Sequence, residues 1–342
     1  MNEIIRDEIG SEFWSIPVAD NEQSAFPQQT RWFISGTSAL QYILKDIIQN
    51  NNPQSAAIPS WCCECMIEPF IREGLDVFFY SVYVDESGTL TCDYTTAPSC
   101  DITLEISYFG YQAQTIKGKP DGILVRDLTH SIFCEKYEDA DYYFGSLRKW
   151  AGFWTGGYAW KKSGWVISDN IMEIDFAYVE LRKGAMEEKL RYLRGEQEDK
   201  TYLASFDQAE DYLDHCCIMK GSSRDIQAAL NFDIQTVCAK RKQNAKCLLK
   251  ALRGYALFKS IGENDCPLFV PILLEPAQRD ELRKFLIRNR VYCPVHWGVT
   301  DLHRLTEPQK YLYDHELSIV CDQRYGQEDM HRIIELITQF MK

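Results

Sequence analysis

The sequence contains no long apolar run. None of its stretches approaches the roughly 20 apolar residues that a membrane-spanning helix requires. The N-terminus, Met-Asn-Glu-Ile-Ile-Arg-Asp-Glu, is acidic and lacks the apolar core of a signal peptide. We therefore expect a protein that does not enter a membrane, is not exported and works in the cytoplasm.

Positive charge is scarce as well. Lys and Arg number 37 against 50 Asp and Glu, which gives a formal net charge of -13. Binding to nucleic acid requires a basic face, so we expect no nucleic-acid partner. An anionic small-molecule substrate would need a local basic pocket within this negative field.

The 13 cysteines lack the arrangement of a disulfide scaffold or a metal site. Several, such as Cys238 and Cys247, lie in stretches with helical spacing, where a thiol acts as a small apolar residue. The densest group is Cys62-Cys63-x-Cys65, whereas structural zinc usually takes two separated pairs of ligands. We expect reduced thiols, in the core or beside a cofactor, and no metal.

Short apolar strands alternate with helical segments in the first half of the chain. Apolar runs indicate strands at 55–59, 77–82, 102–107, 123–126, 142–144 and 157–160, and helical spacing indicates helices at 38–48 and about 64–72. This alternation predicts an α/β fold with a mostly parallel sheet between layers of helices.

The second half has a different pattern. The charged region 176–214 indicates surface helices, and one long helix is predicted over 225–252. Strands at 268–274, 291–293 and 317–320 and helices at 277–288 and 327–341 then predict a small α+β domain. We expect an N-terminal arm (1–30), a large domain (31–235) and a small C-terminal domain (236–342) that pack closely, since no low-complexity linker separates them.

Two charged residues follow neighbouring buried strands. Asp127 ends the run 122–127, and Lys149 comes just after the run 142–146. A buried carboxylate needs a partner, and the protonated ring nitrogen of pyridoxal phosphate (PLP) is a suitable one. A lysine at the next strand end can form the Schiff base and then carry a proton between carbons. The pair therefore predicts a PLP site, although Lys149 with Arg148 is also compatible with an ordinary basic pair on a loop.

Small hydroxyl residues near these strands suit the cofactor phosphate. Ser35-Gly36-Thr37-Ser38 precedes a helix, whose N-terminus carries partial positive charge, and Ser146 lies three residues before Lys149. Taken alone, a serine or threonine before a helix is more often a simple N-cap.

His130 follows Asp127 by three residues. Its side chain can lie against the cofactor ring or hydrogen-bond the phenolic oxygen. The alternative is a histidine whose hydrogen bonds are satisfied within a turn.

In their order along the chain, these motifs resemble those of fold type I PLP-dependent enzymes, and of the DegT–DnrJ–StrS sugar aminotransferases in particular. The resemblance also includes the turn Pro59-Ser-Trp-Cys-Cys63, Gly156-Gly157 and the C-terminal segments Tyr292-Cys-Pro-Val-His-Trp297 and Asp322-Gln-Arg-Tyr325. It implies that Lys149 forms the Schiff base, that Asp127 pairs with the ring nitrogen, and that the phosphate contacts are Gly36, Thr37, Ser38 and Ser146.

The resemblance also implies a homodimer with shared active sites and transfer of an amino group from glutamate to a keto sugar linked to a nucleotide diphosphate. Two departures stand out. The position of the usual ring-stacking aromatic is Cys63, with Trp61 nearby. The stretch Lys220-Gly-Ser-Ser-Arg224, expected from the neighbouring subunit, keeps Arg224 but lacks the usual asparagine. The nucleotide-sugar substrate is therefore left open.

Other residues are candidates for substrate recognition. His296, the adjacent Trp297 and Arg324 can recognise a carboxylate or a sugar hydroxyl, with a role in the domain interface as the alternative. Taken together, the sequence predicts a PLP-dependent aminotransferase acting on a keto sugar or a similar carbonyl compound. The rivals are another PLP reaction, such as elimination or sulfur transfer involving Cys63, and a non-catalytic regulator. Retention of Lys149 and Asp127 speaks against the regulator.

Overall fold

A nine-stranded sheet organises the part of the chain that the computed structural model describes, which comprises residues 7–19, 24–135, 139–168 and 171–342. In their spatial order the strands are β2 (Arg31–Phe33), β10 (Gly157–Lys161), β9 (Tyr142–Ser146), β8 (Ile123–Asp127), β6 (Ile102–Ile106), β3 (Ser55–Pro59), β4 (Asp76–Val84), β5 (Leu90–Asp93) and β7 (Thr115–Lys117).

The central strands β9, β8, β6, β3 and β4 pair in parallel. Strands β10 and β2 at one side and β5 at the other pair antiparallel with their neighbours. The carboxyl ends of the five parallel strands therefore meet at one edge of the sheet, where ligands bind in open α/β folds. The expectation of a mostly parallel, mixed α/β sheet is confirmed.

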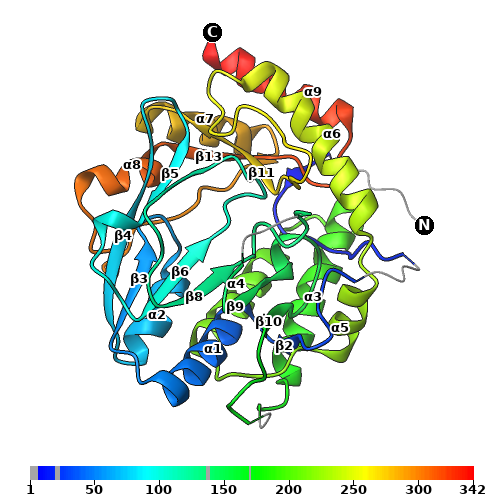
Figure 1. Ribbon diagram of the computed structural model, residues 1–342. Helices are drawn as coiled ribbons and strands as arrows, with labels where there is room; N and C mark the ends of the chain where they lie inside the picture. The colour runs from blue at the N-terminus through cyan, green and yellow to red at the C-terminus, as the bar shows by residue number, and fades with distance from the viewer. Residues whose placement is uncertain (1–6, 20–23, 136–138, 169–170) are drawn as a thin grey trace.

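Two helices early in the chain fix this edge. Helix α1 (Gly36–Asn51) packs on β9 and β10 and places Leu40, Ile43 and Ile47 in the core, as their spacing predicts. Helix α2 (Glu64–Arg72) packs on α1 and β4. Figure 1 shows both helices in blue at the base of the view, with the C-terminal elements above the sheet.

Three further helices, α3 (Phe176–Leu193), α4 (Tyr202–His215) and α5 (Ser223–Leu230), follow the sheet. The rest of the chain comprises α6 (Ile234–Leu252), β11 (Phe269–Leu273), α7 (Pro276–Arg288), β12 (Val291–Tyr292), α8 (Glu307–His315), β13 (Glu316–Val320) and α9 (Gln327–Met341). Strands β11 and β13 pair antiparallel, and β12 pairs with the N-terminal β1 (Ile9–Gly10). Two 3₁₀ turns, η1 (Tyr94–Thr96) and η2 (Leu147–Lys149), complete the elements.

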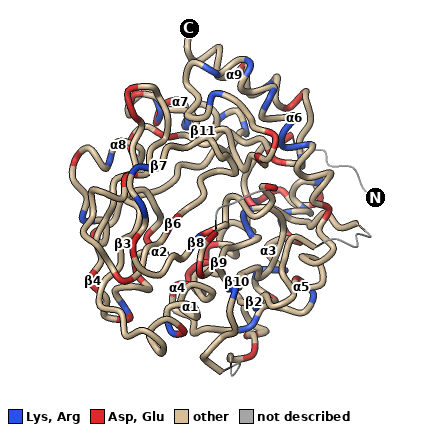
Figure 2. Tube along the Cα trace, viewed as in Figure 1, with Lys and Arg blue, Asp and Glu red and all other residues tan. Residues whose placement is uncertain are grey.

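Charged residues cover the molecule without segregating. Acidic residues are spread over the whole trace and basic residues are interspersed among them (Figure 2), so the net charge of -13 belongs to no single element. No helix among the described residues is long and apolar enough to cross a membrane. All 13 cysteines are free thiols, and no group of metal-ligating side chains in the described ranges is arranged to hold a metal ion.

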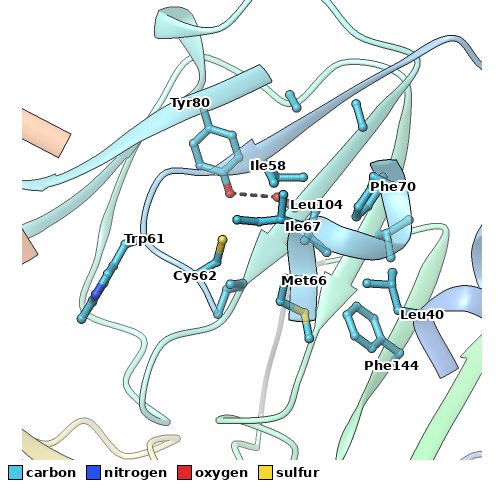
Figure 3. Packing of buried hydrophobic residues seen from close by; sticks show 14 of the residues in the cluster. Leu40, Ile58, Trp61, Cys62, Met66, Ile67, Phe70, Tyr80, Leu104 and Phe144 are labelled. Carbon is cyan, nitrogen blue, oxygen red and sulfur yellow. Dashed lines mark hydrogen bonds between the residues drawn. The ribbon is translucent and has the colours of Figure 1, made fainter. Parts of the chain in front are cut away.

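The main core lies between the sheet and helices α1 and α2. Figure 3 shows Met66, Ile67 and Phe70 of α2 gathered near Leu40 and Ile58. Tyr80 donates a hydrogen bond of 2.9 Å from its hydroxyl to the carbonyl of Leu104, which satisfies this buried polar group. A second core, with Leu248, Leu282 and Ile333 among its members, lies between α6, α7 and α9 and the pair β11–β13.

One prediction about helices is wrong, and a second holds only in part. The single helix expected over 225–252 is broken into α5 and α6, because Phe232 turns into the core and Asp233 accepts a hydrogen bond from the N–H of Thr236 to begin α6. The region 176–214 does form helices, but α3 buries Arg182 and Lys189 and is no simple surface element. The domain boundaries remain predictions.

Candidate active site

The structure brings Asp127 and Lys149 to one cavity. Strands β8 and β9 run in parallel, so their carboxyl ends lie side by side. Asp127 is the last residue of β8, and the turn η2 after β9 ends at Lys149. Both residues line a cavity of about 230 Å³ at this edge of the sheet.

Asp127 is a buried acid suited to a cationic partner. Its side chain is held by the N–H of Thr129, which donates to one carboxyl oxygen at 2.7 Å. Burial raises the pKa of Asp127 to about 6 because the charged form loses its hydration. A protonated ring nitrogen in the cavity would restore the favourable environment of the carboxylate.

Lys149 is available for covalent chemistry. Its neighbour Arg148 forms an ion pair with Glu210 at 2.6 Å and donates to the hydroxyl of Tyr178 at 3.3 Å. Lys149 itself has no hydrogen bond or ion pair within the described ranges, and its side chain is exposed to the cavity. The two basic residues therefore differ: Arg148 anchors the turn, and Lys149 is left for a ligand.

The N-terminus of α1 forms one wall of the cavity. Ser35, Gly36, Thr37 and Ser146 all line it. A Cβ added to Gly36 would lie 3.3 Å from the Cβ of Ser146, so the glycine keeps this space free. Ser35 also caps the helix by accepting a hydrogen bond from the N–H of Ser38 at 3.1 Å. The cap and the anion site therefore coexist.

Ser38 does not join the other hydroxyls. It is buried, is absent from the cavity lining, and its hydroxyl lies 4.0 Å from the sulfur of Cys216. The sequence could not separate Ser38 from Thr37, because both begin the helix and only the helical rotation sends one of them into the core.

His130 lies at the cavity beside Trp297. The two rings are parallel within 17°, with centroids 5.7 Å apart, and both residues line the cavity. Burial lowers the pKa of His130 to about 3, and the nearby ammonium of Lys149 acts in the same direction, so the imidazole is neutral. Its Nδ1 is buried without a hydrogen-bond partner among the described residues. This orphaned atom can bind a polar group of a ligand.

The aromatic residue expected near the ring is placed differently. Trp61 is fully buried, stacks on Tyr108 and donates from its indole nitrogen to the carbonyl of His296 at 2.6 Å. It is not part of the cavity lining, whereas Cys63 is. The flat rings that the cavity does offer are those of His130 and Trp297.

A second thiol, Cys65, also lines this cavity. A hydrogen bond with Cys63 lowers the pKa of Cys65, and the Lys149 ammonium lowers it further. The sequence suggested thiols in the core or beside a cofactor for this group, but singled out Cys63 rather than Cys65. The first turn of α2, which begins directly after Cys63, is what turns both thiols to the cavity.

A larger cavity of about 460 Å³ adjoins the first. Arg148, Lys149 and Glu210 line both cavities, so Lys149 lies at their junction. His296 and Arg324 line the larger one. Arg324 is held by Asp322 at 2.8 Å, and burial keeps the pKa of His296 well below its usual range.

Arg224 lies in neither cavity of its own chain. It is partly exposed, pairs with Asp225 at 2.6 Å and lies over the Trp154 ring at 4.2 Å. The structure thus groups Asp127, Lys149, Gly36, Thr37, Ser146, His130 and Cys63 around one cavity, and leaves Ser38, Trp61 and Arg224 outside it.

The residues fit PLP on their chemistry. A buried carboxylate stands ready for the ring nitrogen, an unpaired lysine for the aldehyde carbon, and a helix N-terminus with hydroxyls for the phosphate. Sequence reasoning missed Thr129, whose N–H orients Asp127. An aspartate two residues before a threonine is a readable Asx-turn signal.

Comparison with known proteins agrees on the fold. No protein-family model matches the chain, and comparison with curated protein sequences finds no significant match. Among solved structures, an aminotransferase of the DegT/DnrJ/EryC1/StrS type from Brucella abortus gives a TM-score of 0.58 at 15% identity, covering 91% of this chain and 85% of that chain.

Two further structures give similar values. The aminotransferase TlmJ from Streptoalloteichus hindustanus has a TM-score of 0.62 at 13% identity and covers 92% of this chain and 86% of that chain. A Streptococcus pneumoniae protein assigned as a sugar aminotransferase, solved in its PLP form, has a TM-score of 0.63 at 12% identity and covers 96% and 98%. The chain therefore has the fold of these aminotransferases, and the predicted fold type I architecture is confirmed.

Proposed function

We propose that this protein is a PLP-dependent aminotransferase. It takes an amino group from an amino acid, with glutamate as the expected donor, and transfers it to a keto sugar or a similar carbonyl compound. The observation that supports this most directly is the meeting of Asp127 and Lys149 on one cavity at the carboxyl edge of parallel strands.

Asp127 has the task of holding a positive charge on the ring nitrogen. Bound PLP supplies an electron sink for negative charge that develops at the carbon bearing the amine. The sink is strongest when the nitrogen stays protonated, and a buried carboxylate favours that state through a charge-assisted hydrogen bond. The N–H of Thr129 fixes the orientation of this carboxylate.

Lys149 has two tasks. Its Nζ would hold the cofactor covalently, and when free it would be the general base placed to move a proton between the reacting carbons. His130 and Trp297 line the cavity with stacked rings, of which the imidazole is neutral because burial lowers its pKa. The N-terminus of α1, with Thr37 and Ser146 in the cavity wall, would hold the cofactor phosphate.

We extend the proposal to a cytoplasmic homodimer. The support is the resemblance to sugar aminotransferases, in which each active site is completed by the neighbouring subunit. The acceptor is proposed as a keto sugar, with the nucleotide part left open by the missing asparagine in residues 220–224.

The test is covalent attachment. Purified protein is mixed with PLP, reduced with borohydride to fix the cofactor on its lysine, digested and analysed by mass spectrometry. We expect the modification at Lys149, its loss in Lys149→Ala, and its retention in Lys45→Ala, which alters an exposed lysine on α1. Conversion to the pyridoxamine form with glutamate would show the donor half-reaction. Attachment at another lysine, or none, would refute the proposal.

One observation keeps a second PLP reaction in view. Cys63 and Cys65 line the cavity with Lys149, and the pKa of Cys65 is lowered, which favours the reactive thiolate. Sulfur transfer or elimination would use such a thiol. In sulfur transfer the Cys65 thiol would take the sulfur of added cysteine as a persulfide, and dithiothreitol would reduce it to free sulfide. Sulfide release from cysteine with dithiothreitol, abolished in Cys65→Ala, in a protein that glutamate does not convert to the pyridoxamine form, would favour this reaction over amino transfer.

A further inference from the structure

The larger cavity beside Lys149 is unusually basic for so acidic a protein. Among the residues that the structure describes, three acidic side chains line it, namely Glu12, Glu210 and Asp322. Twice as many cationic side chains do so: Arg148, Lys149, Arg182, Arg241, Arg283 and Arg324. The cavity therefore carries the local positive charge that an anionic substrate would need within a net charge of -13.

Each acidic side chain is already paired. Asp322 binds Arg324 through both carboxyl oxygens, at 2.9 and 2.8 Å. Glu210 pairs with Arg148 at 2.6 Å. Glu12 pairs with Arg182 at 3.0 Å. Three of the cations thus have an ion-pair partner, whereas Lys149, Arg241 and Arg283 form no ion pair with any described residue.

Of these three cations, Arg241 gives the strongest indication of a bound anion. Its side chain is fully buried, and its hydrogen bonds go to neutral acceptors, namely the side-chain oxygen of Gln323 at 2.7 Å and the carbonyl of Leu268 at 2.8 Å. Its Nη2 has no partner among the described residues. A buried guanidinium without a paired anion is costly, so a bound anion would repay part of its desolvation.

Arg283 also lines this cavity. It belongs to helix α7, and its side chain is exposed. Its Nε donates to the carbonyl of Cys293 at 3.3 Å, and no carboxylate of the described chain forms an ion pair with it. Its other nitrogens are therefore available at the open side of the cavity. Guanidinium groups suit carboxylate and phosphate oxygens because they can donate two parallel hydrogen bonds.

We propose that Arg241 and Arg283 form an anion subsite that binds the acidic group of the substrate whose reacting atom lies at Lys149. The substrate class is a small organic acid that carries a carboxylate or a phosphate. That the bound anion is a substrate rests on the proposed function. Binding of the anion itself can be measured without turnover.

The experiment is calorimetric titration of the PLP-saturated protein at low salt. Glutarate probes a carboxylate, glycerol 3-phosphate probes a phosphate, and glutaramide is the neutral counterpart of glutarate. We expect at least one anion to bind and glutaramide to bind at least about tenfold more weakly, the change expected for losing hydrogen bonds between charged groups. The preferred anion identifies which acidic group the substrate carries.

Variants assign the subsite. Arg241→Gln should weaken the preferred anion at least about tenfold, and the more exposed Arg283→Gln about threefold. Arg288→Gln is the matched control, because Arg288 lies on α7 outside the cavity lining and should leave the affinity unchanged. If Arg241→Gln does not fold, the anion affinity of Arg283→Gln alone tests the subsite. Unchanged affinity in the variants, equal binding of glutaramide, or no anion binding at all would overturn the subsite.

The two proposals can fail separately. If PLP does not attach to Lys149, the aminotransferase proposal fails, and titration without PLP still tests whether Arg241 and Arg283 bind an anion. If PLP attaches and glutamate reacts, but the arginine variants bind anions like the wild type, only the subsite fails. In an active enzyme the variants should raise KM for acidic substrates with little change in kcat.

Discussion

At the scale of single residues, Asp127 shows how a functional group is kept at a cost to stability. Burial raises its pKa to about 6 from 3.8, so without a cationic partner the charged form is disfavoured in the folded protein. The folded state therefore binds more protons than the unfolded state between these values. The contribution of Asp127 to the free energy of unfolding therefore falls as pH rises from about 4 to about 6, and it stays low above that range.

Asp127→Asn should therefore stabilise the protein without PLP at pH 8, by about 3 kcal/mol at most, and change little at pH 4. Urea unfolding at the two pH values measures this difference. His130, whose pKa is lowered to about 3, remains in both proteins, so its own pH dependence cancels. The same variant should lose affinity for PLP. A variant less stable than the wild type at pH 8 would contradict the buried, unpaired carboxylate.

Two of the predicted site residues line the cavity for a simple reason. Asp127 and Lys149 each come at the end of a buried strand, and parallel strand ends must meet. Trp61 was misplaced because the turn after Pro59 directs its ring into the core, against Tyr108. No feature of the sequence indicated that Arg241 lines a cavity. In a helical pattern, an arginine that will be buried looks the same as one on the solvent-exposed face.

At the scale of elements, the contact between β9 and β10 supports the site. Gly145 lies in β9, and a Cβ placed there would be 2.3 Å from the hydroxyl of Tyr158 and 2.8 Å from the backbone nitrogen of Thr129. That nitrogen is the donor that holds Asp127. The absence of a side chain at Gly145 therefore lets β9 approach the turn that orients the acid.

Gly145→Ala should destabilise the protein by about 1–3 kcal/mol through overpacking, and it should also weaken PLP binding by displacing Thr129. Thermal unfolding with and without PLP separates the two effects. Gly164→Ala is the control, because nothing lies within 4 Å of its Cβ position. Equal PLP affinity in the wild type and Gly145→Ala would mean that the turn adjusts without disturbing Asp127.

Elements with a simple apolar run were predictable, and those defined by a cap or by a distant partner were not. Strands β6, β8 and β9 follow their apolar runs closely. The break between α5 and α6 depends on Asp233 as a cap and on burial of Phe232. Helix α8 was missed, since its periodicity is short and its start depends on a reciprocal cap between Thr306 and Gln309.

At the scale of the whole molecule, the surface near Arg224 is where the proposed homodimer can be tested. Arg224 is partly exposed and lies in neither cavity of its own chain. The N–H of Lys220, in the same segment, donates to the carbonyl of Met172 at 2.9 Å. Met172 is 55% exposed and Phe176 is 76% exposed, so large apolar side chains lie on this part of the surface.

If this surface joins two copies of the chain, Arg224 reaches the cavity of the partner and acts in trans. Light scattering should then give twice the chain mass of 39.7 kDa. Lys149→Ala and Arg224→Ala should each lose most activity alone. When the two variants are mixed and allowed to exchange subunits, half of the dimers are mixed, and one of the two sites in each mixed dimer has both residues intact. We therefore expect about a quarter of wild-type activity to return. An Arg224 that acts within its own chain predicts no recovery, because every site would then lack one of the two residues.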